Sequence, residues 1–115
     1  MIQRLQPGAR MSQAVIHGDT IYLAGQVASK TSEGAAGQTR QVLASIDGLL
    51  ADAGSDKTKI LSATVYLVDI ATFADMNSAW DAWVSREHPP ARATVQARLA
   101  ASVYKVEIQV IAAKG

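Results

Sequence analysis

The chain has 115 residues, of which 49% are hydrophobic and 18% are charged, so its length and composition predict one compact domain spanning residues 1–115. Its formal net charge is +1 and its basic residues are scattered, so we expect no nucleic-acid partner and no anionic membrane partner. The absence of cysteine excludes disulfides, thiolate nucleophiles and cysteine metal sites.

Targeting segments and metal-binding motifs are not evident either. The first seven residues lack the long apolar core of a signal peptide, and no apolar run approaches the length of a membrane span. The two histidines, His17 and His88, are isolated and do not predict a histidine-rich metal site. We therefore expect a soluble cytoplasmic protein that needs no metal or other cofactor.

The first predicted element is a tight β-hairpin. Residues 14–17 and 20–24 are short apolar runs separated by Gly18 and Asp19, which both tolerate turn conformations. Residues 29–37 follow; they are rich in Ser, Thr, Gly and Ala, lack periodicity and are predicted to form a surface loop.

A helix and a long strand come next. From Gln38 onward the apolar residues recur at the spacing of one helix face, and Gly54 stands where this helix would end. Gly48 in its interior suggests close packing against a neighbour. Residues 59–68 then alternate, which predicts a strand buried mainly on one side. The residues expected on its buried face are Leu61, Ala63, Val65 and Leu67.

A second helix is predicted after this strand, with Asp69 or Thr72 as its cap. His88-Pro89-Pro90 stops it, because proline cannot continue the helical hydrogen bonding. The residues expected to turn inward are Ile70, Phe73, Met76, Trp80 and Trp83 or Val84.

The last two segments, residues 91–97 and 104–112, alternate between apolar and polar residues and are predicted to pair as a β-hairpin. Both apolar sets must share the buried face, since a slip of one residue would turn one set over. With Leu99 to Ser102 as the loop, Thr94 lies opposite Glu107 and Arg92 opposite Gln109. A guanidinium and a carboxylate then line one small site on the polar face. The residues expected on the buried face are Ala91, Ala93, Val95 and Ala97 in the first strand and Val106, Ile108, Val110 and Ala112 in the second.

The predicted order is therefore ββαβαββ, an α+β fold in which two helices cover one side of a sheet. Four motifs in this order and spacing resemble the Rid family of reactive intermediate deaminases, also called YjgF/YER057c/UK114. They are Ala24-Gly25-Gln26, Phe73-Ala74-Asp75-Met76-Asn77, Pro90-Ala91-Arg92 and Val106-Glu107-Ile108. The similarity runs from about Ser12 to the end of the chain.

The resemblance implies a chorismate-mutase-like fold, with a mixed sheet that carries two helices on one face. It also implies a homotrimer whose uncovered sheet faces turn toward a central barrel and whose ligand clefts lie at the subunit interfaces. The sheet of this chain, with one polar and one apolar face, is consistent with that arrangement.

The residues suit the hydrolysis of 2-imino acids or enamines such as 2-aminoacrylate to 2-oxo acids and ammonia. An arginine offers a planar fork of donors that matches a carboxylate, so Arg92 is expected to bind the substrate carboxylate. Glu107 is expected to activate or position the water that adds to the C=N carbon. The resemblance implies the same two roles, and it places Asn77 near the cleft.

Four positions depart from the family pattern. Met11 replaces a tyrosine that often contributes to the pocket, and Ala24 replaces a serine. Thr94 stands where many members have a cysteine, and Ala100 stands where a proline is common. Loss of a hydroxyl donor costs roughly 0.5–1.5 kcal/mol, enough to change substrate preference. The substrate-binding residues expected from the resemblance are Arg92, Thr94, Asn77, Ala24 and Met11.

Each candidate also has a structural interpretation. Arg92 could pair with an acidic residue across a subunit contact. Glu107 could have no chemical role and merely balance the positive charge of Arg92 or Lys105. Asn77 could be structural, and Thr94 could reflect β-propensity alone. Two other functions stay open: a non-catalytic module that binds small carboxylates, and an endoribonuclease. The lack of a basic stripe, the few aromatic residues and the lack of a histidine pair disfavour the endoribonuclease.

Overall fold

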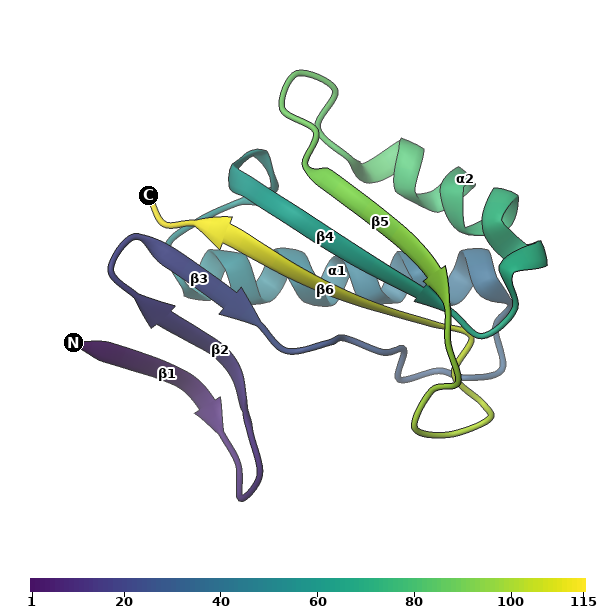
Figure 1. Ribbon diagram of the computed structural model, residues 1–115, viewed down its shortest axis with the longest axis horizontal. Helices are drawn as coiled ribbons and strands as arrows, with labels where there is room; N and C mark the ends of the chain where they lie inside the picture. Colours follow the sequence, from purple (N-terminus) through teal and green to yellow (C-terminus); the bar gives the residue numbers. More distant parts are fainter.

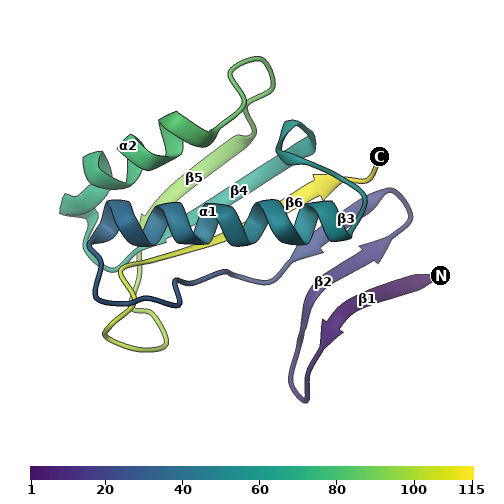
Figure 2. The ribbon, with the colours of Figure 1, turned by 180° about the vertical axis from the view of Figure 1, so that it is seen from behind.

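A computed structural model describes all 115 residues as a six-stranded mixed sheet with two helices on one face (Figures 1 and 2). The α+β class and the single helical layer predicted from the sequence are therefore confirmed. The strand order in the sheet is β1-β2-β3-β6-β4-β5. The strands are β1 (Ile2–Pro7), β2 (Ser12–His17), β3 (Thr20–Leu23), β4 (Ile60–Leu67), β5 (Ala91–Gln96) and β6 (Val106–Ala113). The helices are α1 (Ala35–Asp52) and α2 (Phe73–Trp83), with short 3₁₀ turns at Lys57–Lys59 and Ile70–Thr72.

The N-terminal hairpin is confirmed, and a further strand precedes it. β2 pairs antiparallel with β3 across a turn in which Gly18 has a φ of 61°. β1, which was not predicted, pairs with the other edge of β2. Only Leu5 of this strand is partly buried. The sequence of β1 therefore lacks the alternation of apolar and polar residues by which a half-buried strand is predicted. The observed order is thus βββαβαββ.

Helix α1 packs its predicted apolar stripe onto the sheet, where Val42, Ile46 and Leu50 are completely buried. It begins at Ala35, slightly before the predicted start, and Gly54 follows it with a φ of 83°. The predicted close packing at Gly48 is wrong, because a Cβ placed there meets no atom within 4 Å.

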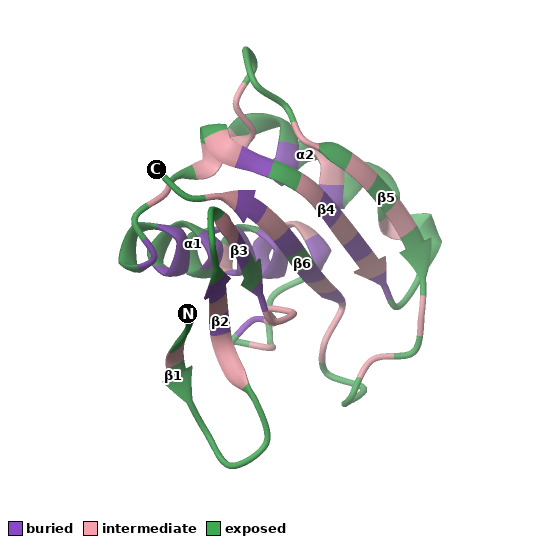
Figure 3. Cartoon of the chain, turned by 60° about the vertical axis from the view of Figure 1, so that its left-hand side comes forward, coloured by how far each residue is buried: buried purple, intermediate pink, exposed green.

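Strand β4 contains a β-bulge between Ile60 and Ser62, which corrects one predicted core position. The bulge shifts the alternation, so Ile60 is 5% exposed and Leu61 is 53% exposed. After the bulge the predicted pattern is confirmed, with Ala63, Val65 and Leu67 buried. Figure 3 shows buried positions alternating along β4 and β6.

Helix α2 turns Met76 and Trp80 toward the sheet, as predicted. Two other positions expected to point inward, Ile70 and Phe73, are instead exposed. Both stand before or at the first residue of α2, where the chain has not yet taken up the helical face that packs on the sheet. Asp69 caps the preceding 3₁₀ turn by accepting a hydrogen bond from Ala71 N.

The predicted β5–β6 hairpin is wrong, because β4 lies between these two strands. β5 pairs parallel with β4, and β6 pairs antiparallel with the other edge of β4. The connection from β5 to β6 passes over the end of β4, where Ala97 N donates to Leu67 O and Val68 N donates to Lys105 O. Alternation identifies a strand and its two faces, but it does not identify the neighbour of the strand.

The corrected pairing also changes which face each residue occupies. Arg92 lies beside Ala63 and Thr94 lies beside Val65, so both point to the helix side of the sheet. Glu107 lies beside Tyr66 on the uncovered side. The predicted buried face of β5 is in fact its exposed face, which consists of Ala91, Ala93 and Val95.

Candidate functional site

Arg92 is on β5, which is an edge strand, and its side chain is half-buried beneath α2. Its Nη1 donates a hydrogen bond to Asn77 Oδ1 at 2.8 Å and lies 3.9 Å from Met76 Sδ. The guanidinium carbon is 5.0 Å from the ring centroid of Trp80 and 5.8 Å from that of Phe73. An amide and two aromatic faces therefore orient this cation.

No acidic side chain pairs with Arg92. The two ion pairs of the chain join Lys59 to Asp56 and His88 to Glu87. The Nε and Nη2 of Arg92 have no hydrogen-bond partner, so the fork keeps free donors. A half-buried cation with no counter-ion in its own chain is suited to bind a carboxylate.

Thr94 lies next to Arg92 on the same face of β5. Its Oγ1 is buried and has no hydrogen-bond partner, which is uncommon for a buried hydroxyl. An unpartnered hydroxyl and a guanidinium with free donors therefore lie on the same face of β5, two residues apart. Together with Asn77, these residues form the first group of the candidate site.

Glu107 is near the start of β6, half-buried on the uncovered face. Its carboxylate lies directly against Gly25, where any Cβ would collide with it. Gln26 holds this arrangement in place, because its backbone N–H donates to Ile108 O at 2.9 Å and its carbonyl accepts from Ile108 N at 3.1 Å. The glycine of the Ala24-Gly25-Gln26 motif is thus explained by the space that Glu107 requires.

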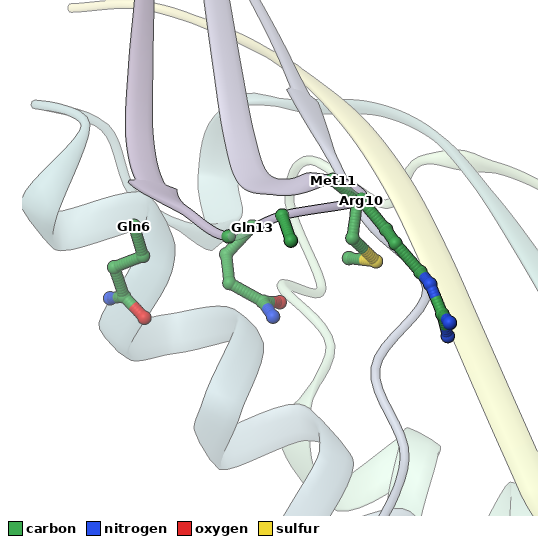
Figure 4. A pocket seen from close by; sticks show the side chains of 6 residues that line it. Gln6, Arg10, Met11 and Gln13 are labelled. Carbon is green, nitrogen blue, oxygen red and sulfur yellow. The ribbon is translucent and has the colours of Figure 1, made fainter.

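A short chain of amides connects Glu107 to the β1–β2 turn. Gln26 Nε2 donates to Gln13 Oε1 at 2.9 Å, and Ala24 N donates to Gln13 O at 2.9 Å. Gln13 in turn lines an open cavity of about 470 Å³, which Met11 also borders (Figure 4). Gln13 thus links the cavity beside Met11 to the backbone of Ala24, and Gly25, the next residue, lies against Glu107. Met11, Ala24 and Glu107, linked in this indirect way, are the second group of the candidate site. The cavity is lined by Gln6, Gly8, Ala9, Arg10, Met11 and Gln13.

The predicted site residues thus fall into two groups on opposite sides of the sheet. Arg92 and Thr94 lie on the edge strand β5 and Asn77 lies on α2, whereas Glu107 lies on the uncovered side of β6. Met11 directly precedes β2, and Ala24 directly follows β3. The prediction that Arg92 and Glu107 share one polar face of a hairpin is wrong, because β4 separates their strands. Within one chain, the Glu107 carboxylate and the Arg92 guanidinium do not form an ion pair.

Three contributors were missed from the sequence. Trp80 was assigned only to the core, although its ring also faces Arg92. Its position three residues after Asn77, on the same helix face, was the available signal. Gln26 was noted only as part of the Ala24-Gly25-Gln26 motif, and its side chain was given no role. Gln13 gave only a weak signal, as a polar residue next to apolar strand positions.

No group of three or more His, Cys, Asp or Glu side chains is arranged to hold a metal ion. Neither helix has the length and apolar character needed to cross a membrane.

Comparison with known proteins gives consistent matches over the full chain. The family model described as endoribonuclease L-PSP matches residues 1–114. A RutC family protein of Haemophilus influenzae is 50% identical over 112 residues, covering 96% of this chain and 97% of the relative. A Bos taurus protein named 2-iminobutanoate/2-iminopropanoate deaminase is 34% identical over 110 residues, covering 90% of this chain and 80% of the relative. The crystal structure of a YjgF family member from Neisseria meningitidis superposes with a TM-score of 0.98 at 45% identity, covering 100% of this chain and 96% of that one.

Proposed function

This chain belongs to the endoribonuclease L-PSP family, also called the Rid or YjgF family, and from that membership we propose that it hydrolyses 2-imino acids to 2-oxo acids and ammonia. Its fold is the chorismate-mutase-like fold of that family. The observation that carries the proposal is the state of Arg92, a half-buried cation that is oriented by Asn77 and Trp80 and has no anionic partner. The name of the Bos taurus relative, a 2-iminobutanoate/2-iminopropanoate deaminase, supports the same reaction class.

The proposed reaction begins with the substrate carboxylate on the free Nε and Nη2 donors of Arg92. Water adds to the imine carbon, and Glu107 accepts a proton from that water while the C=N electron pair moves to nitrogen. Glu107 returns this proton to the nitrogen, and the hydroxyl proton of the tetrahedral intermediate is transferred to the nitrogen in turn, so that ammonia leaves as the C=O bond forms and Glu107 is ionised again. Because imines are already electrophilic, the residues of this chain need only to position the substrate and the water and to transfer protons.

We propose that the two groups meet between two copies of the chain. Arg92 and Glu107 point to opposite faces of one sheet, so a single copy does not bring them to one substrate. The uncovered face also exposes large side chains, with Val95 43% and Tyr22 44% exposed. A homotrimer that buries this face, and that sets Glu107 of one copy near Arg92 of the next, satisfies both features.

The test uses 2-imino acids generated in solution by an amino-acid oxidase, with semicarbazide as a competing trap. We expect the wild type to accelerate ammonia release and to reduce semicarbazone formation. Arg92→Ala should abolish the acceleration while its circular dichroism and thermal melting stay those of a folded protein. No acceleration by folded wild type with any small 2-imino acid would contradict the proposal.

A binding module for small carboxylates is the second candidate. It is favoured by one observation, that all the side chains that orient Arg92 belong to its own chain and that Glu107 is not among them. Such a module would bind 2-oxobutanoate saturably, and Arg92→Ala would weaken that binding, but no imine would be turned over. Turnover that depends on Arg92 would exclude this role.

RNA cleavage, which the description of the family model names, is not favoured by the side chains present. His17 ends β2 and His88 lies between α2 and β5, and neither is hydrogen bonded to a residue of the candidate site. The net charge of +1 supplies no electrostatic attraction for RNA. Salt-sensitive RNA binding by a nuclease-free preparation would return this activity to consideration.

A further inference from the structure

Gln38, in the first turn of α1, has a completely buried polar side chain that makes hydrogen bonds to two loops. Its Oε1 accepts a hydrogen bond from Lys105 N at 2.9 Å. Its Nε2 lies within hydrogen-bond distance of Val103 O at 3.1 Å, Glu33 O at 3.1 Å and Thr31 O at 3.2 Å. A buried amide with this many partners fixes the segments that it touches.

The two loops held by Gln38 continue the two chain segments that surround Glu107. One loop follows the Gly25-Gln26 segment against which the carboxylate packs, and it reaches Gln38 at Thr31 and Glu33. The other loop runs from β5 to β6 and reaches Gln38 just before Glu107. Figures 1 and 2 show both loops converging at the N-terminal end of α1.

The peptide units of Lys105 are held on both sides. Its N–H donates to Gln38 Oε1, and its carbonyl accepts from Val68 N at 3.1 Å. Lys105 is two residues before Glu107, and the strand that contains Glu107 begins at the residue between them. The direction in which β6 starts therefore depends on the hydrogen bond that Lys105 N–H donates to Gln38.

We propose that Gln38 is a positioning residue for Glu107, acting through Lys105 and through the loop that follows Gln26. The inference rests on the proposed deaminase function and assigns Gln38 no contact with substrate. None of the hydrogen-bond partners of Gln38 belongs to α2 or β5, so the Arg92 group is independent of it. Loss of the Gln38 amide should therefore impair turnover and leave carboxylate binding intact.

The experiment compares kcat/KM for imine hydrolysis with the affinity for 2-oxobutanoate, measured by calorimetry as a probe of the Arg92 group. For Gln38→Ala we expect kcat/KM to fall by about tenfold or more, because small misplacements of a reacting group are costly, while the affinity changes less than about twofold. In a Glu107→Gln background the further effect of Gln38→Ala should disappear, since both changes act on one group. A general loss of structure would lower activity in both backgrounds.

Gln41→Ala is the matched control. Gln41 lies on the same helix and bonds to the same loop, with Lys30 N and Lys30 O each 3.0 Å away, but it does not reach the β5–β6 connection. We expect its kcat/KM to stay within about twofold of the wild type, because the Lys105 contact is intact.

A second variant covers the case in which Gln38→Ala does not fold. Lys105→Pro removes the N–H donor to Gln38 at a position just before a strand, where proline is tolerated, and Lys105→Ala, which loses the same side chain but keeps the N–H, is its control. Relative to Lys105→Ala, Lys105→Pro should lower turnover and leave the affinity for 2-oxobutanoate unchanged. Unchanged kcat/KM in the folded variant, or equal losses of turnover and of affinity, would overturn the positioning role while the deaminase function stands. Absence of turnover in the wild type would overturn the deaminase function, and the positioning role with it.

Discussion

Arg92 is oriented by an amide, a thioether and two aromatic rings, and none of these groups carries a negative charge. Cation–π contacts of this kind contribute about 0.5–2 kcal/mol, depending on how far the cation is removed from water. They hold the guanidinium without occupying the fork that binds a carboxylate. An oriented side chain also loses less conformational entropy when a ligand binds.

Gly25 provides the sharpest test of the Glu107 group. A Cβ at this position collides with the Glu107 carboxylate, so Gly25→Ala should displace that side chain and reduce imine turnover about as much as Glu107→Ala does. Turnover is measured by the semicarbazide competition, with thermal melting recorded alongside to confirm folding.

Gly34→Ala is the control for this substitution, because a Cβ at Gly34 meets no atom within 4 Å. It should leave turnover unchanged. A Gly25→Ala variant with wild-type turnover would mean that the position of the Glu107 carboxylate is not important for the reaction.

Residue type and strand alternation marked Arg92 and Glu107 as candidate site residues in the sequence, and their roles stay a prediction. They did not show that the two lie on opposite faces, since that depends on which strand pairs with which. Gln38 was missed, although it falls four residues before Val42 and eight before Ile46 on the same buried helix stripe. A polar residue in an apolar stripe is the signal that marks such a position.

Among the elements, β5 departs most from the prediction. Its alternation correctly indicated a strand, but a parallel pairing with β4 replaced the expected hairpin. The β5–β6 connection crosses the end of β4, where both strands are fixed by backbone hydrogen bonds to Leu67 and Val68. Pairing between strands that are far apart in the sequence is decided by the packing of the whole sheet. The residues of one short segment therefore do not reveal which strand it pairs with.

Helix α1 gives a stability prediction at Gly48. Nothing lies within 4 Å of a Cβ placed there, so Gly48→Ala should fit without strain. Alanine in a helix interior is favoured over glycine by about 0.8–1.0 kcal/mol, and the unfolding free energy in urea should rise by about that amount. A destabilised variant would indicate that the open surface of α1 is packed against something outside this chain.

The 3₁₀ turn before β4 predicts a small dependence of stability on pH. Hydrogen bonds from the Thr58 hydroxyl and backbone N–H lower the pKa of Asp56 below its usual 3.8. A lowered folded-state pKa means that the ionised carboxylate stabilises the fold above pH 3.8 and that this contribution is lost as the pH falls through the folded-state pKa.

Asp56→Ala should therefore destabilise the protein at neutral pH, and the difference from wild type should shrink as the pH falls below 3.8 and through the lowered pKa of Asp56. Urea unfolding of both proteins at several pH values measures this difference. An effect of the substitution that is constant with pH would contradict the assignment to the ionised carboxylate.

The molecule as a whole is a thin slab, with principal extents of 41 × 37 × 20 Å. Both helices cover one face of the sheet, and the other face is open (Figures 1 and 2). Two incomplete groups of site residues lie on opposite sides of this slab. The proposed association of copies through the open face would account both for the exposed apolar side chains and for the incomplete groups.

Subunit complementation tests the shared site most directly. Arg92→Ala and Glu107→Ala are purified separately, each shown to be inactive, then mixed in equal amounts, unfolded and refolded together. In a cyclic assembly, random association pairs an intact Arg92 with an intact Glu107 of the neighbouring copy in about a quarter of sites, so we predict that about a quarter of wild-type activity returns. If the refolded mixture stays inactive while wild type refolded in the same way recovers its activity, Arg92 and Glu107 do not meet between copies, and the account is wrong.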